Sequence, residues 1–243
     1  LKPIHTPTRV RMFGKIIRVL VFETILKFFF CIIENIGDSD GNDVYLSNEI
    51  TYDKDQKKIN TEWKILFNGY DFEGWHQYNG SKISEKWTVE EGIMIFDPSK
   101  GSKKYGGNDI VTNQEFTNFE LSLEWKISEK GNSGLFWGVQ ELENLRTPYL
   151  TGPEIQILDN ERHPDAKINP KFHQAGSLYD MVQPSEDVCN PADQWNIMIL
   201  KIDHSKNLGS VTLNGVEIVK FPLAGPKWQD LVKNSKFSDW EYF

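Results

Sequence analysis

Cysteine is scarce in this sequence, and long basic runs are absent. The two cysteines, Cys31 and Cys189, lie far apart in segments of different character, so neither a disulfide framework nor a zinc motif is indicated. The 27 lysines and arginines are outnumbered by 35 aspartates and glutamates, and no basic run reaches five residues. Because nucleic-acid binding requires a clustered positive surface, a nucleic-acid partner is not expected.

Long apolar runs are missing as well. The segment 11–33 begins with basic residues and becomes largely apolar, which is the order of a secretory signal or an N-terminal anchor. Glu23 and Lys27 interrupt it, and the uninterrupted stretch 28–33 is too short to cross a bilayer alone. We interpret residues 1–36 as a signal or anchor, an amphipathic helix, or a non-native leader. Export would place the protein in the periplasm, in the envelope or outside the cell, with membrane contact only through such an anchor.

Helical periodicity is rare, and no internal repeat is visible. Residues 37–61 are polar and lack a clear period, so they are expected to form a linker. From residue 62 onward, short strand patterns alternate with turn residues. Strands are predicted at 63–67, 75–78, 87–89, 93–96, 109–112, 119–127, 133–139, 154–158, 195–202, 210–213 and 216–221, and a helix only at 227–234.

Two of these strands carry distinct patterns. Apolar and polar residues alternate through 119–127, which predicts one buried and one wet face. In contrast, 195–202 is apolar at nearly every position, which predicts a central strand covered on both sides. Many short strands with scarcely a helix predict an all-β, two-sheet antiparallel jelly-roll sandwich over residues 62–243.

Polar side chains gather in two neighbouring segments, 131–138 and 154–159. Period-two geometry places Glu154 and Gln156 on one face of a strand, opposite Ile155 and Ile157. Such a face is either solvated or lines a concave ligand site. In the first segment, glycines on both sides of Asn132 and Ser133 predict a tight turn with hydrogen-bonding side chains.

The body of the chain resembles a bacterial family named for a 3-keto-disaccharide hydrolase domain. The motifs that carry the resemblance are Leu66-Phe67-Asn68-Gly69, Gly74-Trp75, Trp87-Thr88-Val89-Glu90-Glu91-Gly92, Phe119-Glu120-Leu121, Glu124-Trp125-Lys126, Gly131-Asn132-Ser133-Gly134-Leu135-Phe136, Gly152-Pro153-Glu154-Ile155-Gln156-Ile157-Leu158-Asp159-Asn160, Ala175-Gly176, Leu178-Tyr179-Asp180, Gln194-Trp195-Asn196 and Leu213-Asn214-Gly215-Val216. The resemblance implies a concanavalin- or laminin-like jelly roll. The family usually closes with a Gln-Asp-His-Gly motif and an aromatic-Arg-Asn-Ile strand, which this sequence lacks, so the sandwich is expected to be without its last strands. Trp137 stands where many members have Arg.

The family name implies an oxidised disaccharide or related glycoside as substrate. A ketone at C3 acidifies the hydrogen on C2, so a base can remove it, the anomeric substituent can leave, and water can then add. This route requires a base, a group that stabilises the enolate, and an acid. Direct hydrolysis by two carboxylates is the alternative.

Candidate residues follow from the motifs and from the charged loop after the polar strand. The catalytic candidates are Glu154, Asp159, His163 and His173. The substrate-binding candidates are Asn132, Ser133, Trp137, Gln156 and Tyr179. Asp159 could instead cap a turn, and Trp137 and Tyr179 could belong to the core. The sequence identifies no cofactor with certainty, although Asp159, His163 and His173 could hold a divalent metal.

Two other classes of function remain open at this stage. A sandwich of this kind also hosts lectins, so a non-catalytic carbohydrate-binding module fits the same pattern. A structural adhesion domain is the third class.

Overall fold

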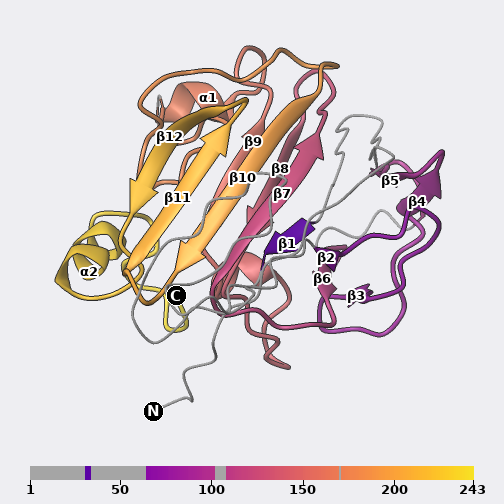
Figure 1. Cartoon of the computed structure of the whole chain (residues 1–243), viewed down its shortest axis with the longest axis horizontal. Coiled ribbons are helices and arrows are strands. Elements are labelled where there is room, and N and C mark those ends of the chain that lie inside the picture. The colour runs from indigo at the N-terminus through magenta and orange to yellow at the C-terminus, as the bar shows by residue number, and fades with distance from the viewer. Residues whose placement is uncertain (1–30, 34–63, 102–107, 170) are drawn as a thin grey trace, which may run out of the picture.

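The computed structural model describes residues 31–33, 64–101, 108–169 and 171–243 (Figure 1). The described strands are β1 (Cys31–Ile33), β2 (Lys64–Ile65), β3 (Trp75–Gln77), β4 (Trp87–Glu90), β5 (Ile93–Phe96), β6 (Ile110–Thr112), β7 (Phe119–Trp125), β8 (Asn132–Phe136), β9 (Glu154–Leu158), β10 (Asn196–Asp203), β11 (Leu208–Leu213) and β12 (Val216–Phe221). The described helices are the 3₁₀ turn η1 (Pro148–Leu150), α1 (Asp165–Ile168) and α2 (Pro226–Lys233).

The largest sheet has the strand order β12-β11-β10-β7-β1-β2, and all its pairings are antiparallel (Figure 1). The predicted alternation in β7 is confirmed, because Leu121, Leu123 and Trp125 are buried while the residues between them are partly exposed. One face of this sheet therefore supplies the core.

Strands β8 and β9 form a separate antiparallel pair. In the view of Figure 1 they lie behind β10 and β7, and Leu135, Ile155 and Ile157 share one hydrophobic cluster with the inward residues of the large sheet. The other edge of β9 is paired as well, because the N–H groups of Gly176 and Tyr179 donate to the carbonyls of Gln156 and Glu154 at 2.8 and 2.9 Å. The fold is an all-β antiparallel sandwich, as predicted.

Smaller elements extend this sandwich at one end of the molecule. Strands β3 and β6 pair with each other, as do β4 and β5 (Figure 1). The turn between β4 and β5 places Glu91 at φ 51° and Gly92 at φ 77°, and the turn between β11 and β12 places Asn214 at φ 50° and Gly215 at φ 87°. Positive φ at both central residues is the geometry that two-residue hairpins require.

Two local predictions are wrong. Strand β10 is not covered on both sides, because its residues alternate in burial and Ile197 is 49% exposed. The large sheet buries one face, so every second β10 side chain points away from the core. Asn132 and Ser133 do not form a turn but begin β8, opposite Leu158 and Ile157. The turn comes earlier, where Lys130 takes a φ of 59°.

The interpretations of residues 1–36 and 37–61 fall mostly outside the described residues. Of these segments the structure describes only Cys31–Ile33, which pairs as β1 with β7 and β2. Within the described ranges, no helix has both the length and the apolar character needed to cross a membrane.

Two substitutions in β10 test the one-sided core. Leu200 is fully buried, so Leu200→Ala should lower the free energy of unfolding by about 2–5 kcal/mol through lost burial and a residual cavity. Ile197→Ala, in the same strand but on the open face, should cost less than about 1 kcal/mol. Chemical denaturation of both variants measures the difference, and equal costs would contradict the one-sided packing.

Candidate active site

The β8–β9 pair holds the carboxyl group of Glu154 directly over the backbone of Gly134. A Cβ atom at position 134 would lie 2.6 Å from Cδ and 2.7 Å from Cγ of Glu154. Only glycine leaves room for this side chain at the start of β9. The Glu154 carboxyl thus occupies the space that a side chain at position 134 would fill, and we call this position its seat.

This position deprives the Glu154 carboxyl of much of its water. The residue is only partly exposed, and its carboxyl makes no hydrogen bond or ion pair with any described residue. Burial raises the pKa of Glu154 to about 8, with Lys236 acting against the rise and Asp165 and Asp109 adding to it. A carboxyl group in such a place is a stronger base than an exposed glutamate, and is still partly ionised near neutral pH.

A hydrogen-bonded group, which we name the His173 network, lies beside Glu154 and consists of Asp165, His173, Tyr179 and Asp180. The two ring nitrogens of His173 lie 2.9 Å from Asp165 Oδ1 and 3.0 Å from Asp180 Oδ1. The hydroxyl of Tyr179 donates to Asp165 Oδ2 at 3.0 Å, and its ring stacks on His173 with centroids 4.3 Å apart. Since the Tyr179 N–H donates to the Glu154 carbonyl, the network is fixed to the start of β9.

The C-terminal segment joins this network through Lys236. Its backbone N–H donates to Asp180 Oδ2 at 2.7 Å, and its ammonium lies 4.0 Å from the centre of the Tyr179 ring. Burial alone would raise the pKa of Asp180, but the bonds from Lys236, His173 and Asn169 outweigh it and hold this pKa below its usual value. The pKa of the Tyr179 hydroxyl is raised by burial and by its bond to Asp165.

Two of the predicted catalytic residues are engaged elsewhere. Asp159 is buried and accepts hydrogen bonds from the backbone N–H groups of Lys130, Glu161 and Arg162, so it ties together two turns. His163 accepts the N–H of Asp165 at 3.1 Å, where α1 begins. Of the four predicted residues, only Glu154 and His173 are brought to one place.

The predicted substrate-binding residues are also spread over different surroundings. Tyr179 belongs to the His173 network. Gln156 is 1% exposed, and its Oε1 accepts the N–H of Ile157. Trp137 packs between Phe221 and Trp228, with ring centroids 5.8 and 6.1 Å away. Asn132 is exposed at the start of β8, and Ser133 is partly buried there.

Several residues of the site were not among the candidates from the sequence. Asp180 lies in a motif of the family resemblance, and Asp165 lies in the charged loop, so both carried a weak signal. Asp109 precedes β6, and burial raises the pKa of its carboxyl as well. Lys236 follows α2 in a stretch without any pattern that points to β9.

The loop between β8 and β9 is tied to β3 by a second histidine. His76 Nε2 lies 2.8 Å from Glu141 Oε2, and His76 Nδ1 lies 2.7 Å from Asn113 Oδ1. Burial opposes the charge of His76, but its bonds to Glu141 and Asn113 prevail and raise its pKa. The ion pair helps to hold this loop in place on the neighbouring strand pair.

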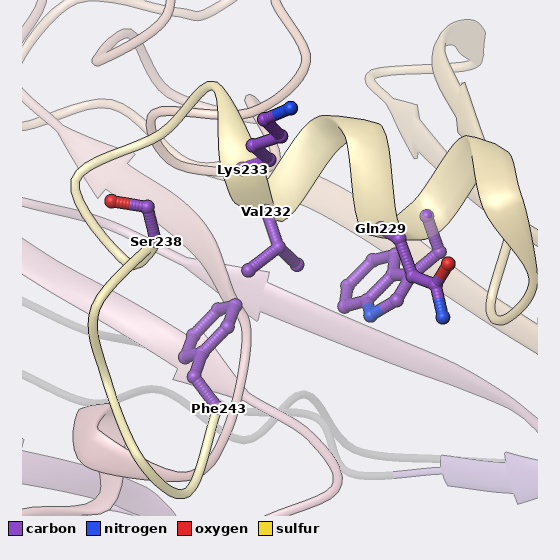
Figure 2. Close-up of a pocket in the computed structure, with 6 residues that line it drawn as sticks. Gln229, Val232, Lys233, Ser238 and Phe243 are labelled. Carbon is purple, nitrogen blue, oxygen red and sulfur yellow. The ribbon is translucent and has the colours of Figure 1, made fainter.

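A shallow hollow of about 270 Å³ lies between α2 and the last residues of the chain (Figure 2). Its lining is Trp228, Gln229, Val232, Lys233, Ser238 and Phe243. It shares no residue with Glu154 or the His173 network, so we do not place chemistry there.

As to metals, the described residues contain no group of three or more His, Cys, Asp or Glu side chains arranged to hold an ion.

The buried carboxyl makes the stability of the protein depend on pH. The folded pKa of Glu154, about 8, lies above the ordinary value of 4.5, so its stabilising contribution is complete below pH 4.5 and is lost as pH rises through 8. Glu154→Gln should remove this loss and be more stable than the wild type at pH 9, by on the order of 2–4 kcal/mol. Denaturant unfolding between pH 4 and 9 measures it, with Glu186→Gln as the exposed control. A wild-type curve parallel to that of Glu154→Gln would contradict the burial.

Comparisons with known proteins agree with this architecture. A 3-keto-disaccharide hydrolase of Bacteroides thetaiotaomicron is 35% identical over 189 residues, which cover 71% of this chain and 63% of that protein. A solved structure from Parabacteroides distasonis, whose assignment as a glycosyl hydrolase is provisional, superposes with a TM-score of 0.67 at 29% identity, covering 74% of this chain and 81% of that one. The model of the 3-keto-alpha-glucoside-1,2-lyase-like domain family matches residues 62–239, and the chain therefore belongs to that family.

Proposed function

We propose that this chain cleaves the glycosidic bond of 3-keto-glycosides, such as 3-keto-disaccharides, by elimination followed by hydration, with Glu154 as the base. The proposal rests on the position of the Glu154 carboxyl over the backbone of Gly134, where it is shielded from water. Among the described residues, this carboxyl has no hydrogen-bond partner. Family membership and the name of the Bacteroides relative support the class of substrate.

The chemistry explains why a dehydrated carboxylate is suited to this reaction. Glu154 takes the C2 proton of the sugar, and the electron pair of the C–H bond forms a C2–C3 double bond while the C3 oxygen becomes an enolate. When the enolate collapses, the C3 ketone is restored, a C1–C2 double bond forms, and the anomeric oxygen leaves as an alcohol with the proton that Glu154 returns, so the carboxylate is regenerated. Water then adds its hydroxyl to C1 and its hydrogen to C2, which gives the free 3-keto sugar.

The neighbours of Glu154 take different parts in this proposal. The His173 network positions Tyr179 and the segment that pairs with β9. Asp159 is left out because both of its carboxylate oxygens accept backbone N–H groups, and His163 because its Nδ1 accepts the N–H of Asp165 at the start of α1. Trp137 is left out because it packs on two aromatic side chains. Tyr179 takes no direct part, because it is buried and its ring is covered by His173 and the Lys236 ammonium.

A raised pKa also suits a general acid, so direct hydrolysis by two carboxylates is the competing mechanism. The acidic neighbours Asp165 and Asp109 favour the protonated form of Glu154 and give this alternative some support. The two mechanisms require opposite forms of the same carboxyl group. They consequently predict opposite responses to pH.

Aglycone release from a 3-keto-glucoside tests the base role. Glu154→Gln should lower kcat/KM by about 10²–10⁴-fold, because an amide cannot accept the C2 proton. In the wild type, kcat/KM should rise with pH and level off above about 8, since only the ionised carboxylate acts.

The outcome of that assay separates the alternatives. Activity that falls above pH 8 would assign Glu154 the acid role and direct hydrolysis. Sugar binding without release, in the wild type and in Glu154→Gln alike, would contradict catalysis and leave a carbohydrate-binding module.

A second substitution tests whether the seat of the carboxyl group matters. Gly134→Ala should displace the end of the Glu154 side chain and lower kcat/KM by about a hundredfold, because the base no longer meets the C2 hydrogen. The double variant with Glu154→Gln should be no worse than Glu154→Gln alone, since both changes act on one group. Independent, multiplicative losses would show that Gly134 acts through something other than Glu154.

A further inference from the structure

Lys236 occupies an exposed position between two buried residues. Ser235 is 9% exposed and Phe237 is 3% exposed, while the N–H of Lys236 is held by Asp180. Asp180 is itself held by His173 and Asn169. The backbone of Lys236 is thus fixed, and its side chain reaches back over the ring of Tyr179.

The ammonium of Lys236 has no carboxylate partner of its own. Among the residues that the structure describes, no Asp or Glu oxygen lies within ion-pair distance of its Nζ; its contacts are the faces of Tyr179 and Phe237, at 4.0 and 5.2 Å from the ring centres. Tyr179, over whose ring the ammonium lies, donates its backbone N–H to the Glu154 carbonyl at 2.9 Å, and the charge of Lys236 favours the ionised form of Glu154. A positive charge is therefore presented beside the carboxyl group and remains available to a ligand.

The other polar groups close to Glu154 are less suited to receive a negative oxygen. Asp165, Asp180 and Asp109 carry the wrong charge. His173 directs both ring nitrogens at carboxylates, and the Tyr179 hydroxyl donates to Asp165. Among the residues that the structure describes near Glu154, Lys236 is the group with the right sign of charge and with donors that are not used.

We propose that the Lys236 ammonium binds the C3 oxygen of the substrate and stabilises the enolate that forms when Glu154 removes the C2 proton. This role rests on the proposed function. As the C–H electron pair moves into the C2–C3 bond, the negative charge on the C3 oxygen faces the ammonium, and it disappears when the C1–O bond breaks. Interactions that strengthen only as this charge develops accelerate the chemical step.

Three variants test this role in the aglycone-release assay. Lys236→Met should lower kcat by about a hundredfold or more with little change in KM, because the lost interaction forms in the transition state. Lys236→Arg keeps the charge and should stay within about tenfold of the wild type. Lys233→Met removes an equal charge from the exposed end of α2 and should leave kcat unchanged.

The pH profile separates this role from a merely structural one. Without the ammonium, the Glu154 carboxyl loses its favourable charge, so the midpoint of kcat/KM in Lys236→Met should move to higher pH. Thermal unfolding should show Lys236→Met as stable as Lys233→Met, because the backbone N–H to Asp180 is retained.

The outcomes distinguish this role from the proposed function. An active wild type with Lys236→Met as active as Lys233→Met would overturn the role of Lys236 and leave the base mechanism standing. A loss that Lys236→Arg does not relieve, with an unmoved pH midpoint, would overturn it too. A wild type that releases no aglycone would overturn the proposed function, and this role with it.

Discussion

The dehydration of one carboxyl group is the constraint on which the site depends. Glu154 sits over a backbone position that carries no side chain, and burial raises the pKa of its carboxyl group to about 8. A carboxylate without hydrogen-bond donors is costly to ionise. The surroundings must therefore either keep it protonated or supply a positive charge. Asp165 and Asp109 favour the protonated form, and Lys236 supplies a positive charge that favours the ionised form.

The His173 network makes this arrangement rigid. Two carboxylates hold the imidazole from opposite sides, and each carries a second bond: Asp165 to the Tyr179 hydroxyl and Asp180 to the N–H of Lys236. Segments that are distant in sequence, the α1 region and the chain after α2, are thereby joined to β9. Because every member has more than one partner, the position of the Lys236 backbone follows from that of His173.

The sequence predicted the strands well where local chemistry decides. The alternation in β7 and the left-handed turn residues Asn214 and Gly215 are visible in the letters alone, because side-chain period and turn geometry are local properties. The prediction for β10 failed because a run of apolar residues does not reveal that one face of the sheet stays open. The turn was predicted at Asn132 and Ser133 because glycines flank them, but the residue with positive φ is Lys130.

The site was predictable only in part, because the contacts that form it are tertiary and are not encoded by local sequence patterns. Period two placed Glu154 on a polar face, but the carboxyl group is seated by Gly134 on another strand, and that contact depends on register. Asp159 and His163 have side chains suited to catalysis, but they accept backbone N–H groups at a turn and at the start of α1. Sequence spacing does not distinguish such structural hydrogen bonds from a catalytic role. Lys236 reaches the site through tertiary hydrogen bonds, which no local pattern encodes.

The balance of charges around Glu154 favours a base over an acid. An acid needs only to be kept protonated, and burial with the neighbouring Asp165 and Asp109 would do that without help. A cation beside the carboxyl works against that purpose, because it stabilises the ionised form. Elimination gives such a cation two uses, since the base must ionise before it acts and the oxygen of the substrate must carry negative charge afterwards. Direct hydrolysis through an oxocarbenium-like transition state would instead place a developing positive charge near Lys236. The unpaired ammonium thus fits a reaction that passes through an anion.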